Sequence, residues 1–259
     1  PDIDIIDCGT RPATRLAMVL AALEHRKHVY NGAPHAPDWA GAKAIDTAWR
    51  RAGTVGVVDA FSQWIPALRQ MAALVDQGYL GEVLGGTCRF NLSLFNLPDK
   101  RLPYNWFADA GAGVSALRNN GSHVLHMLLR LLGPVAEVTG GERQLLKEWR
   151  FADGDSVTPA NPDHADVLLR FASGVTVALQ ASFAMPLPCG WSIDLFGSQG
   201  RLLAESPSFP TARDCKLSGG KLGGALEPIA SPAEYLTASG IALDWQSEPH
   251  PSYPMALSM

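Results

Sequence analysis

Apolar positions follow a strand, helix, strand rhythm over the first sixty residues of the chain. The run 3–8 is β-branched, and behind the turn at 9–12 apolar residues recur at helical spacing up to about residue 26. Residues 28–30 and 54–58 predict two more short strands, and 37–51 predicts the helix between them. Such alternation is typical of βαβ units, whose parallel strands end at one common edge. We therefore expect the loops at Thr10 and Asn31 to face the same cleft.

The pattern changes after Pro66. Helices are predicted from residue 66 to Gly78 and over 117–132, before Gly133-Pro134. Long strands joined by hairpins indicate a second sheet that is mainly antiparallel. The predicted fold is therefore α/β plus α+β: a parallel-sheet domain at 1–60, then an open, mainly antiparallel sheet domain at 61–259 with helices on one face. Strands are predicted at 83–94, 135–138, 165–171, 175–183, 193–196 and 201–203, and loops at 172–174, 186–190, 197–200 and 218–224.

One face of the predicted second sheet needs a cover. Alternation at 87–94 and 175–183 leaves that face apolar or small, and a partner subunit is a common cover for such a surface. We therefore expect a homo-oligomer that associates through the sheet face of the second domain.

Composition and charge argue against several classes of protein and of partner. The chain has 259 residues, 47% of them hydrophobic, and a formal net charge of −4 without a run of like charges, so neither nucleic acid nor an anionic membrane is an expected partner. No segment has the roughly eighteen consecutive apolar residues of a membrane span. The four cysteines lie far apart, which suits a cytoplasmic protein. Both ends look cut: the chain opens in a strand-like run, and 254–259 resembles the start of a helix.

The most informative polar stretch is 109–126. Its glycines allow the backbone to approach a ligand closely, and the polar first turn of an otherwise apolar helix places His123 where it could serve as an acid or base. Alternatively, His123 is a core histidine that bonds a neighbouring carbonyl. His126 lies three residues on, a spacing that can chelate a metal, but no third ligand stands nearby and no metal is expected.

Aromatic residues in the loop before this stretch are candidates for a substrate pocket. Arg101, Tyr104 and Trp106 lie between elements in a segment interrupted by prolines, although the aromatic rings could equally anchor the loop itself. The chain has no GxSxG, HExxH or phosphate-binding P-loop motif.

Four segments in consistent order resemble one family. Residues 4–12 resemble a strand that ends in C-T-P-P, 21–29 resembles A-L-E-x-G-K-H-V, 74–83 is similar to a helix-to-strand signature, and 121–123 matches G-S-H. On these segments the chain resembles the Gfo/Idh/MocA oxidoreductases, which include glucose-fructose oxidoreductase and inositol dehydrogenase, from its first residue to about Ala204.

The resemblance implies a Rossmann domain that binds NAD or NADP, and a second domain that carries the substrate pocket and often an oligomer interface. It also implies that the chain starts at the fourth Rossmann strand, so that the glycine fingerprint lies outside it. The implied roles are as follows: catalysis by His123 and Asn119; cofactor binding by Thr10, Arg11, Pro12, Tyr30, Asn31, Pro34 and Gln63; substrate binding by Arg101, Tyr104, Trp106, Asn120 and His126.

Three departures from the family pattern leave two functions open. Ala33 replaces the catalytic lysine of E-K-P, Asn119 replaces an aspartate, and 61–64 replaces an asparagine-arginine pair. The longer spacing between the glycines and His123 is similar to the branch that contains the galactose-regulon repressor of yeasts. The first hypothesis is an oxidoreductase that exchanges hydride between NAD(P) and a sugar or cyclic polyol. The alternative is a regulatory protein that senses a dinucleotide or a sugar without turning it over.

Overall fold

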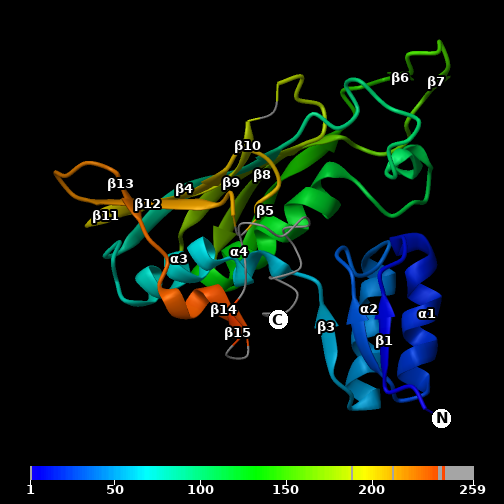
Figure 1. Ribbon diagram of the computed structural model, residues 1–259, viewed down its shortest axis with the longest axis horizontal. Coiled ribbons are helices and arrows are strands. Elements are labelled where there is room, and N and C mark those ends of the chain that lie inside the picture. The colour runs from blue at the N-terminus through cyan, green and yellow to red at the C-terminus, as the bar shows by residue number, and fades with distance from the viewer. Residues whose placement is uncertain (1, 188, 212, 239–240, 243–259) are drawn as a thin grey trace.

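The computed structural model describes residues 2–187, 189–211, 213–238 and 241–242. It contains a small parallel sheet near the N-terminus and a much larger mixed sheet (Figure 1). No helix in these ranges is long and apolar enough to span a membrane. The helix expected at 254–259 lies outside the described residues.

The small sheet confirms the parallel arrangement predicted from the sequence. Its strands lie in the order β1-β2-β3, and both neighbouring pairs are parallel. Val19 and Leu23 pack with Val29 and Cys8, so the helices bury one face of this sheet. Because the strands are parallel, the loops that follow β1 and β2 lie at one edge, as expected. The elements are β1 (Ile5–Cys8), α1 (Pro12–Glu24), β2 (His28–Asn31), α2 (Trp39–Ala52) and β3 (Gly56–Val58).

The large sheet has eight strands in the described part of the chain, in the order β13-β12-β11-β10-β4-β9-β8-β5. Every neighbouring pair is antiparallel except β4 with β9, which confirms a mainly antiparallel sheet. Its strands are β4 (Val83–Asn91), β5 (Val135–Arg143), β8 (His164–Phe171), β9 (Thr176–Ser182), β10 (Gly190–Gly197), β11 (Gly200–Ser206), β12 (Lys216–Lys221) and β13 (Glu227–Ile229). Two short hairpins pair β6 (Trp149–Arg150) with β7 (Ser156–Val157) and β14 (Thr237–Ala238) with β15 (Ile241–Ala242).

Two helices, α3 (Pro66–Asp76) and α4 (Ser122–Leu132), cover one face of the large sheet (Figure 1). Leu68 and Met127 pack there with Phe90 and Trp191, all of them fully buried. Each such side chain contributes roughly 1.5–3 kcal/mol by leaving water. The described residues also form four short helical turns: η1 (Phe61–Trp64), η2 (Asn105–Ala108), the π-helical η3 (Leu117–Gly121) and η4 (Ala233–Leu236).

The loop predicted at 218–224 is wrong. Strand β12 continues through Lys221, and only the residues after it form a turn. Ser218 pairs with Leu203, while Leu217 packs in the core. The glycines at 219 and 220 look like turn residues in the sequence. In the structure they fit close contacts, because a Cβ on Gly220 would lie 2.4 Å from the carbonyl oxygen of Ala225.

We propose the domain boundary at 60–61. Val58 ends the last strand of the small sheet, whereas the buried Phe61 belongs to the core beneath the large sheet.

Candidate functional site

The loops at the carboxyl edge of the small sheet contact the second domain directly. The Arg11 guanidinium lies 5.1 Å from the centre of the Trp106 ring, and Arg118 Nη1 donates a hydrogen bond of 2.8 Å to the carbonyl oxygen of Pro37. Gly113, with a φ of 76°, lies so close to Pro37 that a Cβ there would come within 2.6 Å of its Cα. The glycine run was expected to let a ligand approach, but Gly113 brings two backbone segments together instead.

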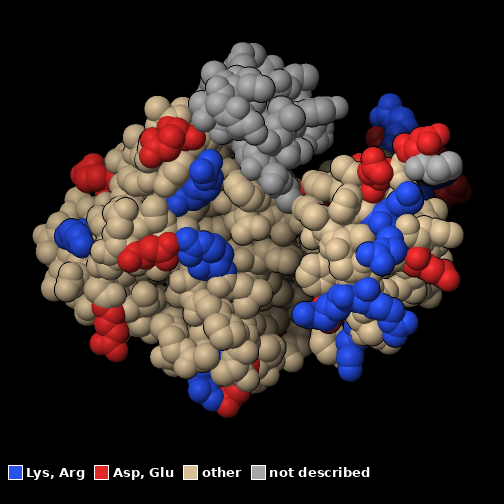
Figure 2. Space-filling view, turned by 90° about the horizontal axis from the view of Figure 1, so that it is seen from below, with Lys and Arg blue, Asp and Glu red and all other residues tan. Residues whose placement is uncertain are grey.

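A cavity of about 520 Å³ separates these loops from one face of η3 and α4. The surface is visibly hollowed between the two lobes in Figure 2. Of the predicted site residues, Pro34 and His126 line this cavity. Four further polar or charged side chains, which the sequence analysis did not single out, also line it: His35, Asp38, Arg118 and Ser122.

His123, unlike His126, does not line this cavity. Its ring packs between Phe61 and Phe209, with centroid distances of 4.9 and 5.3 Å. Nδ1 is buried without a hydrogen-bond partner in the described chain, so the alternative of a histidine bonded to a neighbouring carbonyl is not what the structure has. Burial, with a smaller contribution from His126, lowers the pKa of His123 to about 4. The imidazole is therefore neutral at physiological pH.

Two asparagines belong to the π-helical turn before α4. Asn119 carries a buried Oδ1 that has no partner among the residues described, and its backbone oxygen accepts a bond of 2.8 Å from Ser122 Oγ. Asn120 is buried, and its Nδ2 donates to the carbonyl oxygen of Phe90 at 3.5 Å. Asn120 thus ties this turn to β4. Asn119, four residues before His123, has a buried acceptor without a partner among the described residues.

The predicted coenzyme residues divide into an exposed and a buried group. Thr10 and Arg11 are exposed, and Pro12 opens α1, which has no side-chain cap on its first N–H groups. An uncapped helix start beside an exposed guanidinium suits a phosphate group. Asn31, by contrast, is only 4% exposed and donates through Nδ2 to the carbonyl oxygen of His35 at 3.0 Å. Gln63 lies half-buried in η1.

Tyr30 meets a carboxylate at the end of β3. Its hydroxyl donates a hydrogen bond of 3.0 Å to Asp59 Oδ1. Burial raises the pKa of Tyr30 above its usual range, and burial likewise raises the pKa of Asp59. Both groups therefore hold their protons more tightly than they would in water, although Asp59 still ionises more readily than the phenol.

Arg15 is a site residue that the sequence analysis missed. It is 4% exposed, and its Nη1 donates to the carbonyl oxygen of Gly32 at 2.7 Å. Further short hydrogen bonds join it to the carbonyl oxygens of Pro34 and Thr10. One guanidinium thus holds together the two loops at the carboxyl edge. The sequence signal that could have revealed Arg15 is its place among the apolar, inward-facing positions of the predicted helix.

The structure separates the three predicted residues of the aromatic loop. Arg101 pairs with Asp99 at 2.8 Å and is 90% exposed, and it lines a different hollow of about 490 Å³. Tyr104 makes an edge contact with Phe107. Among the described residues, Trp106 alone of the three contacts a loop of the small sheet, through the guanidinium of Arg11.

Comparison with known proteins identifies the family. Residues 68–203, more than half of the chain, match the GFO/IDH/MocA C-terminal domain. The chain belongs to this family. Levoglucosan dehydrogenase of Pseudarthrobacter phenanthrenivorans is 25% identical over 198 residues, which cover 70% of the chain and 50% of that protein. Glucose-fructose oxidoreductase domain-containing protein 1 of Mus musculus is 27% identical over 143 residues, covering 55% of the chain and 35% of that protein.

Solved structures support the same fold. An NAD binding oxidoreductase from Klebsiella pneumoniae superposes with a TM-score of 0.78 at 25% identity, over 89% of this chain and 61% of that one. An inositol dehydrogenase homolog from Azotobacter vinelandii, solved with NADH and myo-inositol, gives 0.80 at 17% identity, over 99% of this chain and 64% of that one. The GFO/IDH/MocA chain described here thus spans half or less of its curated relatives and under two thirds of these structures.

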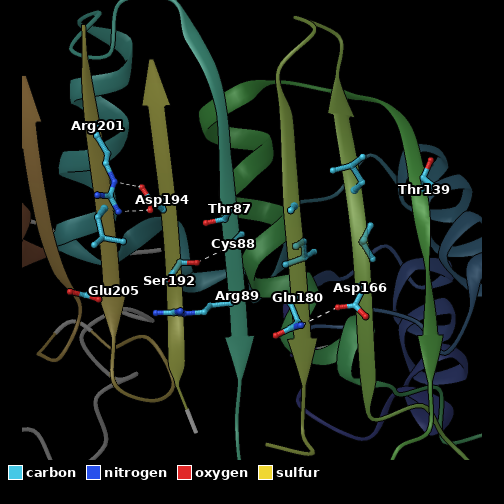
Figure 3. A pocket seen from close by; sticks show the side chains of 15 residues that line it. Thr87, Cys88, Arg89, Thr139, Asp166, Gln180, Ser192, Asp194, Arg201 and Glu205 are labelled. Atoms are coloured by element: carbon cyan, nitrogen blue, oxygen red, sulfur yellow. Dashed lines mark hydrogen bonds and ion pairs between the residues drawn. The ribbon is translucent and has the colours of Figure 1, made fainter. Parts of the chain in front are cut away.

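The outer face of the large sheet holds a second hollow, of about 700 Å³ (Figure 3). Arg201 Nη2 bonds Asp194 at 2.7 Å, and Gln180 Nε2 donates to Asp166 at 3.0 Å. Arg89 extends over β10 in Figure 3 without a recorded partner. The sequence predicts an apolar or small face. Small residues do form the floor of the hollow, but charged side chains occupy other outward-pointing positions of these strands and surround them.

The buried His123 predicts a loss of stability in acid. In the unfolded chain His123 titrates near 6.5, but in the folded chain it titrates at about 4. The unfolded state therefore binds more protons below pH 6.5, and the free energy of unfolding falls as pH drops through this window, by roughly 2–3 kcal/mol for this group. Urea titrations between pH 4 and 8 should show a shallower decline for His123→Gln than for the exposed control His25→Gln. Equal slopes would contradict the prediction.

Proposed function

We propose that this GFO/IDH/MocA chain belongs to an NAD(P)-dependent oxidoreductase that exchanges hydride with a CH–OH carbon of a sugar or cyclic polyol. The observation that carries the proposal is the cavity at which the carboxyl-edge loops of the parallel sheet face η3 and α4, the helix that bears His123. The same loops contact the turns before this helix, through Arg11 with Trp106 of η2 and through Arg118 of η3 with Pro37. Family membership supports it, as does the naming of relatives as levoglucosan dehydrogenase and inositol dehydrogenase homolog.

The coenzyme fits the carboxyl edge on one structural ground, the uncapped start of α1 beside the exposed Arg11. We assign Thr10, Arg11 and Pro12 to a phosphate or ribose of NAD or NADP. Tyr30, Asn31, Pro34 and Gln63 then shape the loops around it, the buried Asn31 through its bond to His35. When bound, the coenzyme accepts or supplies the hydride.

His123 takes the role of acid and base in this proposal. Its Nδ1 is buried without a partner and its ring does not line the interdomain cavity, so we assign proton transfer to Nε2, the ring nitrogen farther from the backbone. Asn119 is assigned to the substrate through its side-chain Nδ2, because its Oδ1 is buried like His123 Nδ1, and Asn120 keeps the turn in place through Phe90. Trp106, Tyr104, Arg101 and His126 are proposed substrate contacts, of which His126 lines the interdomain cavity.

A second function has specific support, a regulatory protein that binds a dinucleotide or a sugar without turnover. Ala33 cannot move a proton where the family has lysine, and Asn119 cannot carry a charge. A pKa of about 4 also makes His123 a weak base, whereas general bases work best near the operating pH. These three observations favour sensing over chemistry.

One assay separates the two functions. The protein is incubated with NAD or NADP and a panel of sugars and polyols, while absorbance reports the reduced nicotinamide. Turnover that depends on His123 supports the enzyme. Saturable dinucleotide binding without turnover for any member of the panel supports the sensor, and neither binding nor turnover contradicts both.

We further propose that two copies of the chain associate through the outer sheet face, and that the protein is cytoplasmic, with no nucleic-acid or membrane partner. The widely spaced cysteines fit a reducing compartment. On the outer face, Arg89, Ser192 and Glu205 form one row across β4, β10 and β11. An unpaired cation and an anion in one row complement each other when a copy is turned by two-fold symmetry.

Substituting Leu168, which is 47% exposed on β8 and lines the outer hollow, should break the association. Leu168→Asp buries an unpaired carboxylate in the interface, so light scattering should show a monomer at micromolar concentration. The control Leu222→Asp changes a leucine that is 84% exposed in the turn after β12 and should leave the mass unchanged. A wild-type protein that is already monomeric at this concentration would contradict the proposal.

A further inference from the structure

A smaller cavity lies within the small-sheet layer, apart from the three hollows described above. It measures about 240 Å³, is partly open to solvent and is lined by α1, α2, β2 and β3. Its walls are largely apolar, and the side chains that the argument uses are Val29, Ile45, Trp49, Val57 and His35. The proposed oxidoreductase has no use for this space.

One wall of the cavity is an aromatic ring held in place. Trp49 Nε1 donates a hydrogen bond of 2.7 Å to the carbonyl oxygen of Thr54. Gly56 makes room for the indole, because a Cβ there would come within 2.9 Å of Nε1. The Arg50 guanidinium lies 5.6 Å from the ring centre. The indole is therefore fixed before any ligand arrives, which lowers the entropic cost of binding against it.

His35 lies toward the other end of the cavity. Trp49 and Gly56 are near the amino end of β3, whereas His35 follows the carboxyl end of β2, and the two strands are parallel. Burial, with a smaller effect of Arg15, lowers the pKa of His35, so its imidazole is neutral and offers one donor and one acceptor. The cavity thus has an aromatic wall at one end and one neutral polar group at the other.

We propose that this cavity binds a small, flat, mostly apolar ring compound that carries a single uncharged hydrogen-bonding group, of the phenol or indole class. A dry apolar cavity of ~150 Å³ is large enough for benzene, so this one accepts a ring with a substituent. The ring packs against Trp49, and the hydroxyl or N–H group bonds His35. A charged ligand is excluded, since the carboxylate that lines the cavity, Asp46, is already bonded to Arg50.

The cavity is connected to the interdomain site through two residues. His35 and Val58 line both cavities, and the backbone oxygen of His35 holds Asn31. A ligand that fixes the His35 ring therefore changes the wall of the interdomain cavity. Binding in one cavity is expected to alter affinity in the other.

Titration of the full chain with p-cresol tests the proposal, followed by ligand-observed NMR and by the thermal midpoint. We expect saturable binding at submillimolar to millimolar concentration, and at least tenfold weaker binding of p-toluate, which replaces the hydroxyl by a carboxylate. Ile45→Phe fills the cavity and should weaken p-cresol binding at least tenfold. The matched control Leu222→Phe adds a ring at a leucine that is 84% exposed in the turn after β12, away from both cavities, and should leave binding unchanged.

Circular dichroism confirms that each variant is folded, and Val57→Leu replaces Ile45→Phe if the latter is not. Absence of saturable binding up to the solubility limit overturns the proposal and leaves the cavity as a packing defect. Binding that survives the filling substitution, or that is lost in Leu222→Phe, places the ligand elsewhere and also overturns it. Because the readout is binding of p-cresol, these outcomes do not depend on whether the protein turns over a sugar.

Discussion

Replacing His123 by alanine is expected to lower turnover of a sugar or polyol by about a hundredfold or more, the usual range for loss of a general acid or base. Ala33 leaves no second group at the family's lysine position, so no neighbouring amine compensates. The effect should fall on kcat rather than on dinucleotide affinity, because His123 lies on the second domain, against Phe61 and Phe209. Steady-state kinetics and dinucleotide titration of the same preparation measure both.

The control is His25→Ala, which changes an exposed histidine at the end of α1. It should retain full activity. Near-normal turnover in His123→Ala would remove this residue from catalysis. His126, whose side chain lines the interdomain cavity, would then be the next candidate.

Arg15→Met should have the largest effect on stability, a loss of about 3 kcal/mol in the free energy of unfolding. The substitution keeps an unbranched side chain but removes the guanidinium, and so leaves the carbonyl oxygens of Thr10, Gly32 and Pro34 without their shared charged donor. A loss of this size corresponds to a fall of roughly 10 °C in the melting temperature for a chain of this length. Dinucleotide binding should weaken as well, because both loops at the carboxyl edge lose their common support.

Arg118→Met is the matched control for this prediction. Arg118 is exposed and bonds one carbonyl oxygen, that of Pro37, so its loss should cost about 1 kcal/mol or less. Comparable destabilisation of the two variants would show that the buried guanidinium has no special structural role. Differential scanning calorimetry of both proteins decides between these results.

Periodicity predicted most of the architecture because the chain is locally consistent. Short β-branched runs, helical spacing and glycine turns predict the main helices and strands up to β11, but not the two-residue strands β6 and β7. Gly174 has the positive φ of 92° that its hairpin loop requires. Strand β12 was missed because Gly219 and Gly220 carry no strand preference of their own. They join the strand through pairing with β11. Glycine is needed at both positions because the neighbouring strands and the turn after β12 leave no room for side chains.

The candidate site was harder to predict because its contacts join distant segments. Phe209 reaches His123 from the connection between β11 and β12, and nothing near His123 in the sequence announces it. The interdomain contact of Gly113 with Pro37 is equally remote along the chain. Arg15 was within reach of a local argument, since a charged residue at an inward position of an amphipathic helix needs a partner.

The central position of β4 sets the order in which the protein folds. Thr87 pairs with Ala178 on one side and with Asp194 on the other, so β4 must wait for partners about ninety or more residues later in the chain. The hairpins β8–β9 and β10–β11 close over short loops and are expected to form first, because short loops cost less entropy. They then dock on either side of β4. During synthesis, β4 leaves the ribosome with both edges unpaired for several seconds, and during that interval it is the segment most exposed to aggregation.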